Sequence, residues 1–185
     1  MSLPRQRPLP VDQTRRFLEP GPVVLLSTAW KDRRAVMACG WHMMLGYDLV
    51  GTYIWQENAS HELARRSRQC VINLPTEPLL DTVVRIGNCC SAQVDKFQRF
   101  GLEALPARQV QAPRIGQCHA SFECQLLHSR ISADYPLFVW KVVAAHAAPR
   151  PANPRTLHYR GRGQFMVAGQ LRSRRHLFRP DMLEM

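Results

Sequence analysis

Residues 36–44, VMACGWHMM, are the stretch from which the fold of this chain is best approached. From Val36 the segment is strand-like, and its side chains become small from Ala38 to Gly40. The next residue is Trp41. Small residues allow another group to approach the backbone closely. This stretch therefore predicts a close contact with either a second strand or a bound ligand.

The segments on both sides of this stretch have the pattern of short strands joined by turns. Residues 22–28, PVVLLST, are apolar and β-branched, and a polar turn leads into the returning strand 34–39. Further strands are predicted at residues 47–55, 70–74, 119–126 and 137–145, with a pair inside 157–167. Helices are predicted at residues 58–68, 78–86 and 95–100. The pattern indicates a mainly β fold, most simply a β-barrel with a few short helices, in a single domain spanning residues 1–185.

Two of these strands differ in their expected burial. Between 119 and 126 apolar residues alternate with Ser121, Glu123 and Gln125, which predicts a half-buried strand. Residues 137–145 are nearly all apolar, so we expect that strand to be covered on both faces, at the centre of a barrel or at a subunit interface. In the strand 47–55, Gly51 marks a bulge or a point of close approach.

Composition limits the class of protein. The chain has 45% hydrophobic and 21% charged residues, which is typical of a globular protein. It contains no apolar run of membrane-spanning length, and the first residues lack the apolar core of a signal peptide, so we expect a cytoplasmic protein with no membrane partner. Six cysteines without a CxxC pair predict reduced, mostly buried thiols.

The net charge of +11 is concentrated near the C-terminus. Residues 150–179 contain eight arginines and no acidic residue. A basic surface attracts nucleic acid, but it attracts phosphorylated cofactors as well. Only Tyr159, Phe165 and Phe178 offer stacking rings there, and no nucleic-acid-binding motif is present, so nucleic acid is the less favoured partner.

Three short motifs are candidates for a functional site. The predicted helix start at 58–61 would offer free backbone N–H groups to an anion such as phosphate, or would be an ordinary N-cap. The small-residue stretch would accept a flat ring beside Trp41, or would be a tight crossing of strands. Lys96, in the sequence VDKF, would reach a ligand carbonyl or phosphate, or would be a surface lysine paired with an acid.

Other chemistry finds weaker support in the sequence. Cys39 and His42 have the spacing of two metal ligands, but no second pair lies nearby, so we expect no metal site. Cys39 could serve as a nucleophile, although no base for it can be identified.

Several motifs in a fixed order resemble the flavin reductase-like, FMN-binding split-barrel family, and within it the flavoredoxin type. The resemblance extends from about Gln13 to Phe178. Its motifs are PGPVVLLST, RAVMACGWHMM, NASHEL, CVINLP, VDKFQRFGL, APRIGQCHASFECQL and LHYRGRGQF. The order of several separate motifs is more specific than any one of them.

The resemblance implies a split β-barrel of Greek-key-like topology that forms a homodimer and holds one non-covalent FMN near the dimer interface. Residues 1–12 would form an N-terminal arm, and residues 149–185 would form a C-terminal extension at that interface. The residues it implies for FMN binding are Met37, Ala38, Cys39, Gly40, Trp41, Asn58, Ala59, Ser60, His61, Lys96 and Phe165. Many relatives carry an Arg and a Thr where this chain has Asn58 and Ser60, so a formal charge is missing from the phosphate segment.

The activity implied is that of an NAD(P)H-dependent flavin reductase or a flavoredoxin-like electron carrier. Hydride would pass from NADH or NADPH to N5 of the flavin, and the electrons would move on to an acceptor, which could be a protein. Lys96 is the candidate catalytic residue, since a positive group near the N1–C2=O edge stabilises the reduced flavin. The alternatives are a split-barrel FMN protein with a non-nicotinamide substrate and a basic nucleic-acid-binding barrel.

Overall fold

The computed structural model describes residues 5–128 and 135–183. The strands are β1 Arg7–Leu9, β2 Val24–Trp30, β3 Arg33–Cys39, β4 His42–Met44, β5 Leu49–Tyr53, β6 Gln69–Leu74, β7 Ala104–Leu105, β8 Arg114–Ile115, β9 Ala120–His128, β10 Leu137–Ala147, β11 Leu157–Gly161 and β12 Gln164–Val167. The α-helices are α1 Arg15–Leu18, α2 Ala59–Ser67, α3 Leu80–Gly87 and α4 Lys96–Arg99. Short 3₁₀ helices are η1 Val11–Thr14, η2 Glu77–Leu79, η4 Arg175–Leu177 and η5 Pro180–Met182.

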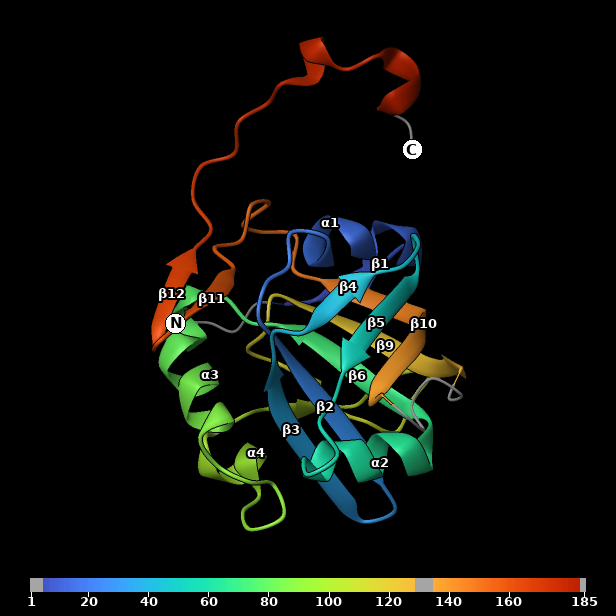
Figure 1. The fold of residues 1–185 in the computed structure, drawn as a ribbon, viewed down its shortest axis with the longest axis vertical. Helices are drawn as coiled ribbons and strands as arrows, with labels where there is room; N and C mark the ends of the chain where they lie inside the picture. Colours follow the sequence, from blue (N-terminus) through green and yellow to red (C-terminus); the bar gives the residue numbers. More distant parts are fainter. Residues whose placement is uncertain (1–4, 129–134, 184–185) are drawn as a thin grey trace.

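One curled antiparallel sheet forms the body of the molecule (Figure 1). Within the described residues its strand order is β3-β2-β6-β9-β10-β5-β4, with β1 beside β10. Sequence neighbours such as β5 and β6 are separated in this order, which makes the topology Greek-key-like. The two edge strands β3 and β4 are joined in the chain by Gly40 and Trp41 alone. The barrel is therefore split at the stretch VMACGWHMM, and the mainly β, split-barrel fold predicted from the sequence is confirmed.

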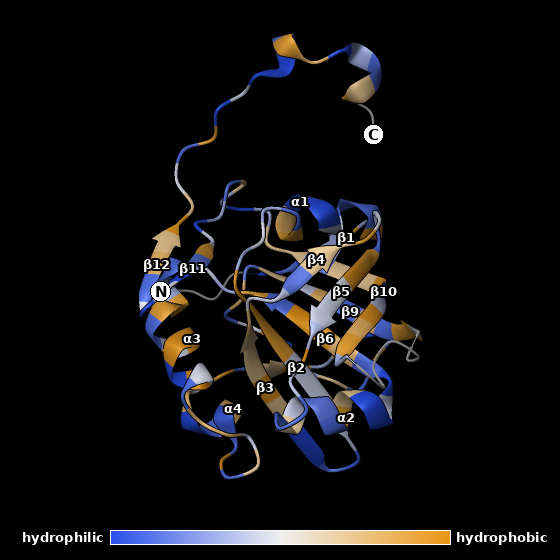
Figure 2. Ribbon diagram, in the orientation of Figure 1, coloured by the Kyte–Doolittle hydropathy of each residue, from blue (hydrophilic) through white to orange (hydrophobic). Residues whose placement is uncertain are grey.

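The core lies inside the curl of the sheet, where hydrophobic residues follow the central strands (Figure 2). Phe138 and Trp140 stack with ring centroids 5.4 Å apart, and the indole N–H of Trp140 donates to Thr52 Oγ1 at 2.8 Å. A second apolar cluster outside β3 joins α3 and α4 to the sheet through Val36, Ile86 and Phe97. This second cluster fixes the position of α3 on β3.

Several strands differ from their predicted burial or extent. The interpretation of 119–126 as half-buried is wrong, because Ser121 and Glu123 are completely buried. The Ser121 hydroxyl donates to Asn73 Oδ1 at 2.8 Å, and the Glu123 carboxylate accepts backbone N–H groups from the loop that covers it. The predicted strand 47–55 begins at Leu49, and β4 is a separate strand that the sequence pattern did not reveal.

The expectation that β10 is covered on both faces is also only half right within the single chain. Phe138, Trp140 and Val142 are buried, whereas Lys141 is exposed and the side chains on its face are half-buried. Gly51 of β5 is a point of close approach, since a Cβ there would stand 3.3 Å from Leu45 Cδ1 and 3.4 Å from Met43 Cγ. The outer face of β4, β5 and β10 is therefore largely apolar apart from Lys141, which pairs with Asp48.

The two ends of the chain behave differently. Part of the predicted N-terminal arm, residues 1–12, forms β1 and pairs with β10, while residues 1–4 of that arm lie outside the described residues. The predicted C-terminal extension, residues 149–185, begins with the hairpin β11–β12 and continues as an extended segment that leaves the body (Figure 1). No helix in the described parts of the chain has the length and apolar character needed to span a membrane.

Candidate functional site

The site is built on the split between β3 and β4. β3 ends at Cys39, and the chain crosses to β4 through Gly40 and Trp41. The Tyr53 N–H donates to the Trp41 carbonyl at 2.9 Å, which ties the crossing to β5. A ring nitrogen of His42 lies 2.6 Å from the Pro22 carbonyl and anchors the start of β4. The crossing is thus fixed from both sides and leaves its own backbone facing a cavity.

This cavity has a volume of about 720 Å³. Its floor is the small-residue end of β3, and aromatic rings form one wall. The Trp41 and Tyr53 rings meet edge to face at 5.3 Å, and Trp55 lies 6.2 Å from Tyr53. The residues that line it are Val23, Met37, Ala38, Cys39, Gly40, Trp41, Tyr53, Trp55, Asn58, Val83, Val84, Gly87, Asn88, Tyr159, Gly163 and Phe165.

The opposite wall comes from α3 and the hairpin β11–β12. α3 lies against β3 at Gly87, where a Cβ would make an ordinary contact of 4.0 Å with the Ala38 Cβ. The Tyr159 and Phe165 rings of the hairpin lie 5.0 Å apart. The cavity, called the slot from here on, is thus lined by small residues of β3, by aromatic rings from two parts of the chain and by Val83 and Val84 of α3.

The N-terminus of α2 stands at one end of the slot. Asn58 is its N-cap residue and lines the slot, and its side chain makes no capping hydrogen bond. Ala59 instead lines a neighbouring cavity of about 640 Å³, together with Arg33 and Arg34. Arg33 pairs with Glu62 at 3.3 Å and Arg34 with Asp95 at 2.7 Å. Two guanidinium groups therefore stand beside the same helix terminus.

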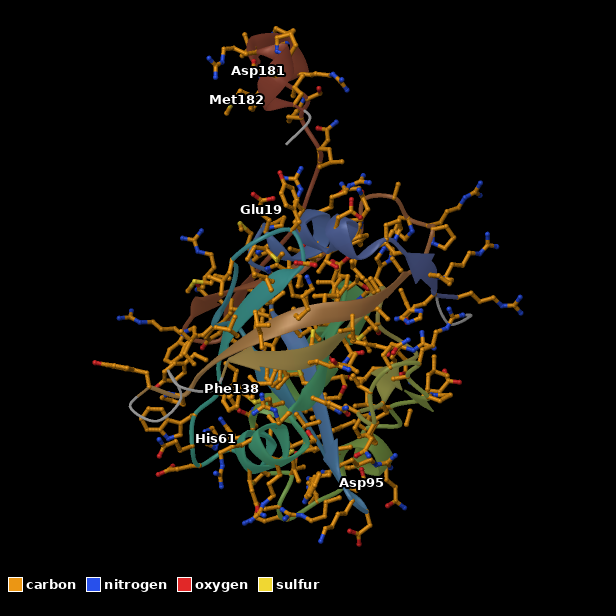
Figure 3. All side chains as sticks on the ribbon, turned by 90° about the vertical axis from the view of Figure 1, so that its right-hand side faces the viewer. Glu19, His61, Asp95, Phe138, Asp181 and Met182 are labelled. Atoms are coloured by element: carbon orange, nitrogen blue, oxygen red, sulfur yellow. The ribbon has the colours of Figure 1, made fainter. Side chains whose placement is uncertain are left out.

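Ser60 and His61 lie deeper than the sequence predicted. Ser60 is buried, and the His61 ring packs edge to face on Phe138 at 5.3 Å, as Figure 3 shows. Burial lowers the pKa of His61, and the nearby Arg65 lowers it further. Neither residue is among those that line the slot.

Lys96 lies behind the slot rather than in it. It is the first residue of α4, whose N-terminus is capped by the Asp95 carboxylate accepting from the Phe97 and Gln98 N–H groups. The Lys96 side chain is only 5% exposed, and its Nζ donates to the Ile86 carbonyl at 2.8 Å. Burial lowers the pKa of Lys96, an effect partly opposed by Cys89 and Cys90. The ammonium group therefore supports the end of α3 that forms the wall of the slot.

The Cys39 thiol is unreactive at this site. Burial raises the pKa of Cys39 to about 11, so its thiol stays protonated at neutral pH and is a poor nucleophile. All six cysteines are within the described residues and all are free thiols. The described residues contain no group of three or more His, Cys, Asp or Glu side chains placed to hold a metal ion.

The structure places only part of the predicted set of site residues around one cavity. Residues 37–41, Asn58 and Phe165 line the slot. Ala59 lines the neighbouring cavity, and Ser60, His61 and Lys96 line neither. Sequence reasoning missed Tyr53 and Trp55, whose position at the end of β5 beside the helix start was an available signal. It also missed Val83, Val84, Gly87 and Asn88, since nothing in the sequence shows that α3 packs across β3.

Comparison with known proteins gives the family and the fold of this chain. Residues 15–166 match the flavin reductase like domain family. An uncharacterised protein of Pyrococcus abyssi is 30% identical over 131 residues, which make up 70% of this chain and 75% of the relative.

Two solved structures share the fold. The FMN-binding domain of a flavin reductases-like enzyme from Shewanella baltica superimposes with a TM-score of 0.86 at 24% identity, covering 94% of this chain and 99% of that one. Flavoredoxin of Desulfovibrio vulgaris superimposes with a TM-score of 0.76 at 16% identity, covering 85% and 91%.

Proposed function

The chain belongs to the flavin reductase-like domain family, and from this we propose that it is an FMN-binding oxidoreductase that takes electrons from NADH or NADPH. The observation that carries the proposal is the slot at the barrel split, where a bare stretch of β3 faces aromatic rings. The lining of the slot alone does not identify a ligand, and the family match is the reason for proposing a flavin there.

The residues present fit FMN. An isoalloxazine ring is flat, with apolar faces and polar edges, and the slot offers small side chains below and main-chain N–H and C=O groups at residues 37–40. A ribityl phosphate needs an anion site, and the start of α2 offers free N–H groups and the Asn58 amide at the end of the slot. Both parts of the cofactor thus find suitable groups within one continuous region.

The missing charge of the phosphate segment has a candidate replacement. Relatives often carry an arginine near the helix start, where this chain has Asn58. Arg33 and Arg34 stand beside Ala59 in the neighbouring cavity, each held by one carboxylate. A guanidinium has five N–H donors, so one ion pair leaves donors available for a phosphate. We infer that these two arginines supply the positive charge.

The chain's own residues would orient the cofactor and exclude water. When bound, FMN would accept a hydride at N5 and pass the electrons to an acceptor. Trp41, Tyr53 and Trp55 would shield one edge of the ring from solvent, and α3 would close the other side. The protonated Cys39 thiol, 3.6 Å from the Trp41 carbonyl, would hold the crossing in place without taking part in chemistry.

Lys96 is proposed to act on the flavin through its charge from behind the wall. A buried cation is felt over a longer range than an exposed one, because the interior screens it less. Lys96→Met keeps the length of the side chain and removes the charge. It is expected to lower the midpoint potential of bound FMN, and an unchanged potential would rule this role out.

The remaining parts of the proposal concern partners and location. We propose a homodimer and a downstream electron acceptor, which could be a protein. Six free thiols are typical of a reducing compartment, which supports the cytoplasm.

The test is the visible absorption spectrum of the purified protein, followed by anaerobic titration with NADH and then NADPH. We expect a yellow protein whose flavin absorption bleaches with at least one of the two. A yellow protein that neither nucleotide bleaches would keep the site and favour a non-nicotinamide substrate. A colourless protein that does not bind added FMN would overturn the proposal.

A further inference from the structure

Cys89 and Cys90 are the cysteines that the fold leaves accessible. The other four cysteines of the chain are buried, whereas these two are half-buried. Both lie in the loop between α3 and α4, two helices that share one apolar cluster at the side of the sheet (Figure 1). A thiol that solvent reaches can react with small molecules, and a buried thiol is protected from them. The accessible thiol chemistry of this chain therefore lies in this loop.

Cys89 also lines a cavity, which we call the thiol cavity. Its volume is about 370 Å³, and its other lining residues are Arg85, Asn88, Arg99 and Phe100. Sites for small molecules usually have volumes of about 300–1,000 Å³, so the thiol cavity is large enough for a small ligand. Cys90 is not among the lining residues. The two adjacent thiols therefore differ in what a ligand would find beside them.

The Cys89 sulfur is held in place by the C-terminal end of α3. Its thiol donates to the Arg85 carbonyl at 3.4 Å and lies 3.9 Å from the Ile86 carbonyl. The Lys96 Nζ donates to the same Ile86 carbonyl at 2.8 Å. The sulfur thus has a defined position on the cavity wall, with a buried ammonium group close to it.

Two guanidinium groups give the thiol cavity a positive charge. The side chain of Arg85 makes no hydrogen bond or ion pair with any residue in the described parts of the chain. The Arg99 guanidinium lies over the Phe100 ring, 5.8 Å from its centroid, and leaves its N–H donors unused. The planar fork of arginine N–H groups matches the geometry of a carboxylate. A ligand that carries carboxylate groups would therefore find two partners beside the sulfur.

The acidic residues one helical turn before these arginines do not neutralise them. Asp81 precedes Arg85 by four residues, and no ion pair joins the two side chains, both of which the structure describes. Asp95 precedes Arg99 in the same way, but its carboxylate pairs with Arg34 at 2.7 Å. The lining of the thiol cavity contains no acidic residue. Its positive charge is therefore available to a ligand.

The neighbouring thiol is a poor disulfide partner for Cys89. Cα atoms joined by a trans peptide lie about 3.8 Å apart, whereas disulfides usually join Cα atoms about 4.4–6.8 Å apart. The peptide bond between Cys89 and Cys90 is not cis. A disulfide between them would be strained and easily reduced. Cys89 is thus better placed to form a disulfide with a small molecule than with Cys90.

We propose that Cys89 is a modification site, at which a small disulfide that carries carboxylate groups forms a mixed disulfide with the protein. Arg85 and Arg99 would bind the carboxylates and bring the small disulfide to the sulfur. The Cys89 thiol loses its proton to water, and the thiolate attacks one sulfur of the small disulfide. A bond forms between Cys89 Sγ and that sulfur, the original S–S bond breaks, and the released thiolate takes up a proton. An excess of free thiol reverses the exchange.

The thiol cavity borders the flavin slot. Asn88 lines both, and it directly precedes Cys89 in the chain. A group bound to the Cys89 sulfur would therefore lie next to the wall that α3 gives to the slot. Any effect of the modification on FMN rests on the proposed function, whereas the modification itself does not, because no step of it uses the flavin.

The test is incubation of the full-length protein with glutathione disulfide, followed by mass spectrometry of the intact chain and of its peptides. We expect a glutathione adduct on Cys89, in the unsubstituted protein and in Cys90→Ser alike, and no adduct in Cys89→Ser. An excess of dithiothreitol should remove it. An adduct on another cysteine, a disulfide between Cys89 and Cys90 in its place, or no adduct at all would each overturn the proposal.

A second experiment checks recognition by charge. The rate of modification is measured with glutathione disulfide and with the uncharged 2-hydroxyethyl disulfide, and the ratio of the two rates cancels any change in the reactivity of the thiol itself. Arg85→Gln combined with Arg99→Gln is expected to lower this ratio at least about fivefold, as the loss of two exposed ion pairs implies. Arg7→Gln, at an exposed arginine of β1, is the matched control and should leave the ratio unchanged. The same ratio in the double variant as in the unsubstituted protein would mean that the arginines do not select the disulfide, which overturns the proposal.

Discussion

Gly40 lies in the small-residue stretch for which the sequence predicts either a tight crossing of strands or a contact with a ligand. A substitution at Gly40 can distinguish these two predictions. A Cβ placed on Gly40 would meet no atom of the described protein within 4 Å. Its backbone also does not adopt the left-handed conformation that requires glycine. Neither packing nor backbone geometry therefore explains the absence of a side chain. The flavin proposed above would occupy the open space beside this backbone.

Gly40→Leu is accordingly expected to fold normally and to lose flavin. The leucine side chain would extend into the slot and occupy the place of the ring, weakening FMN binding by at least about tenfold, equivalent to 1.4 kcal/mol. The measurement is FMN titration by fluorescence quenching together with the urea midpoint of the apoprotein. Gly169→Leu is the matched control, because a Cβ there also meets open space. Normal FMN affinity in Gly40→Leu would mean that the ring does not lie against this backbone.

At the scale of elements, the strand β9 shows how a buried charge holds a loop. The Glu123 carboxylate accepts the N–H groups of Arg108 and Gln109 at 2.9 and 2.6 Å, and a ring nitrogen of His146 lies 2.8 Å from it. Glu123 itself is completely buried. A buried carboxylate is tolerated only with such partners, so the loop and the charge depend on each other.

Glu123→Gln is expected to loosen this loop and to destabilise the protein by about 2–4 kcal/mol, because hydrogen bonds to a charged acceptor are lost and buried donors remain. Urea unfolding measures the stability, and hydrogen exchange at the amides of Arg108 and Gln109 reports the loop. Glu103→Gln, at an exposed carboxylate, should change neither. Unaltered exchange at those two amides in Glu123→Gln would contradict the argument.

The same strand shows where sequence reasoning reaches its limit. The alternation at 119–126 predicted the strand correctly, because periodicity reports local backbone geometry. It gave the wrong environment for Ser121 and Glu123, because their burial depends on a loop and a strand far away in the chain. Residues 37–41 were predicted to lie together at a cavity, and they do, because they form one continuous segment. The α3 wall was missed, since its position over β3 is a long-range packing result.

At the scale of the whole molecule, buried histidines make the stability of the fold depend on pH. His119 and His146 are each only 3% exposed, and burial lowers the pKa of both below the ordinary 6.5. For His146 the hydrogen bond to Glu123 opposes this effect, while the nearby Arg114 and Arg108 add to it. Burial lowers the pKa of His42 as well. These rings are therefore neutral in the folded protein at a pH where they are already protonated in the unfolded chain.

The sign of the pH dependence follows from this difference. Above about pH 6.5 the rings are neutral in both the folded and the unfolded state, so they contribute no pH dependence. As the pH falls through 6.5, the unfolded chain binds protons that the folded protein does not, and the free energy of unfolding therefore decreases. Each such proton contributes up to roughly 1.4 kcal/mol per pH unit. We expect the urea midpoint to be level between pH 7 and 8 and to fall progressively from about pH 6.5 to 5. A midpoint that stays constant or rises over that interval would mean that these histidines are protonated within the folded barrel.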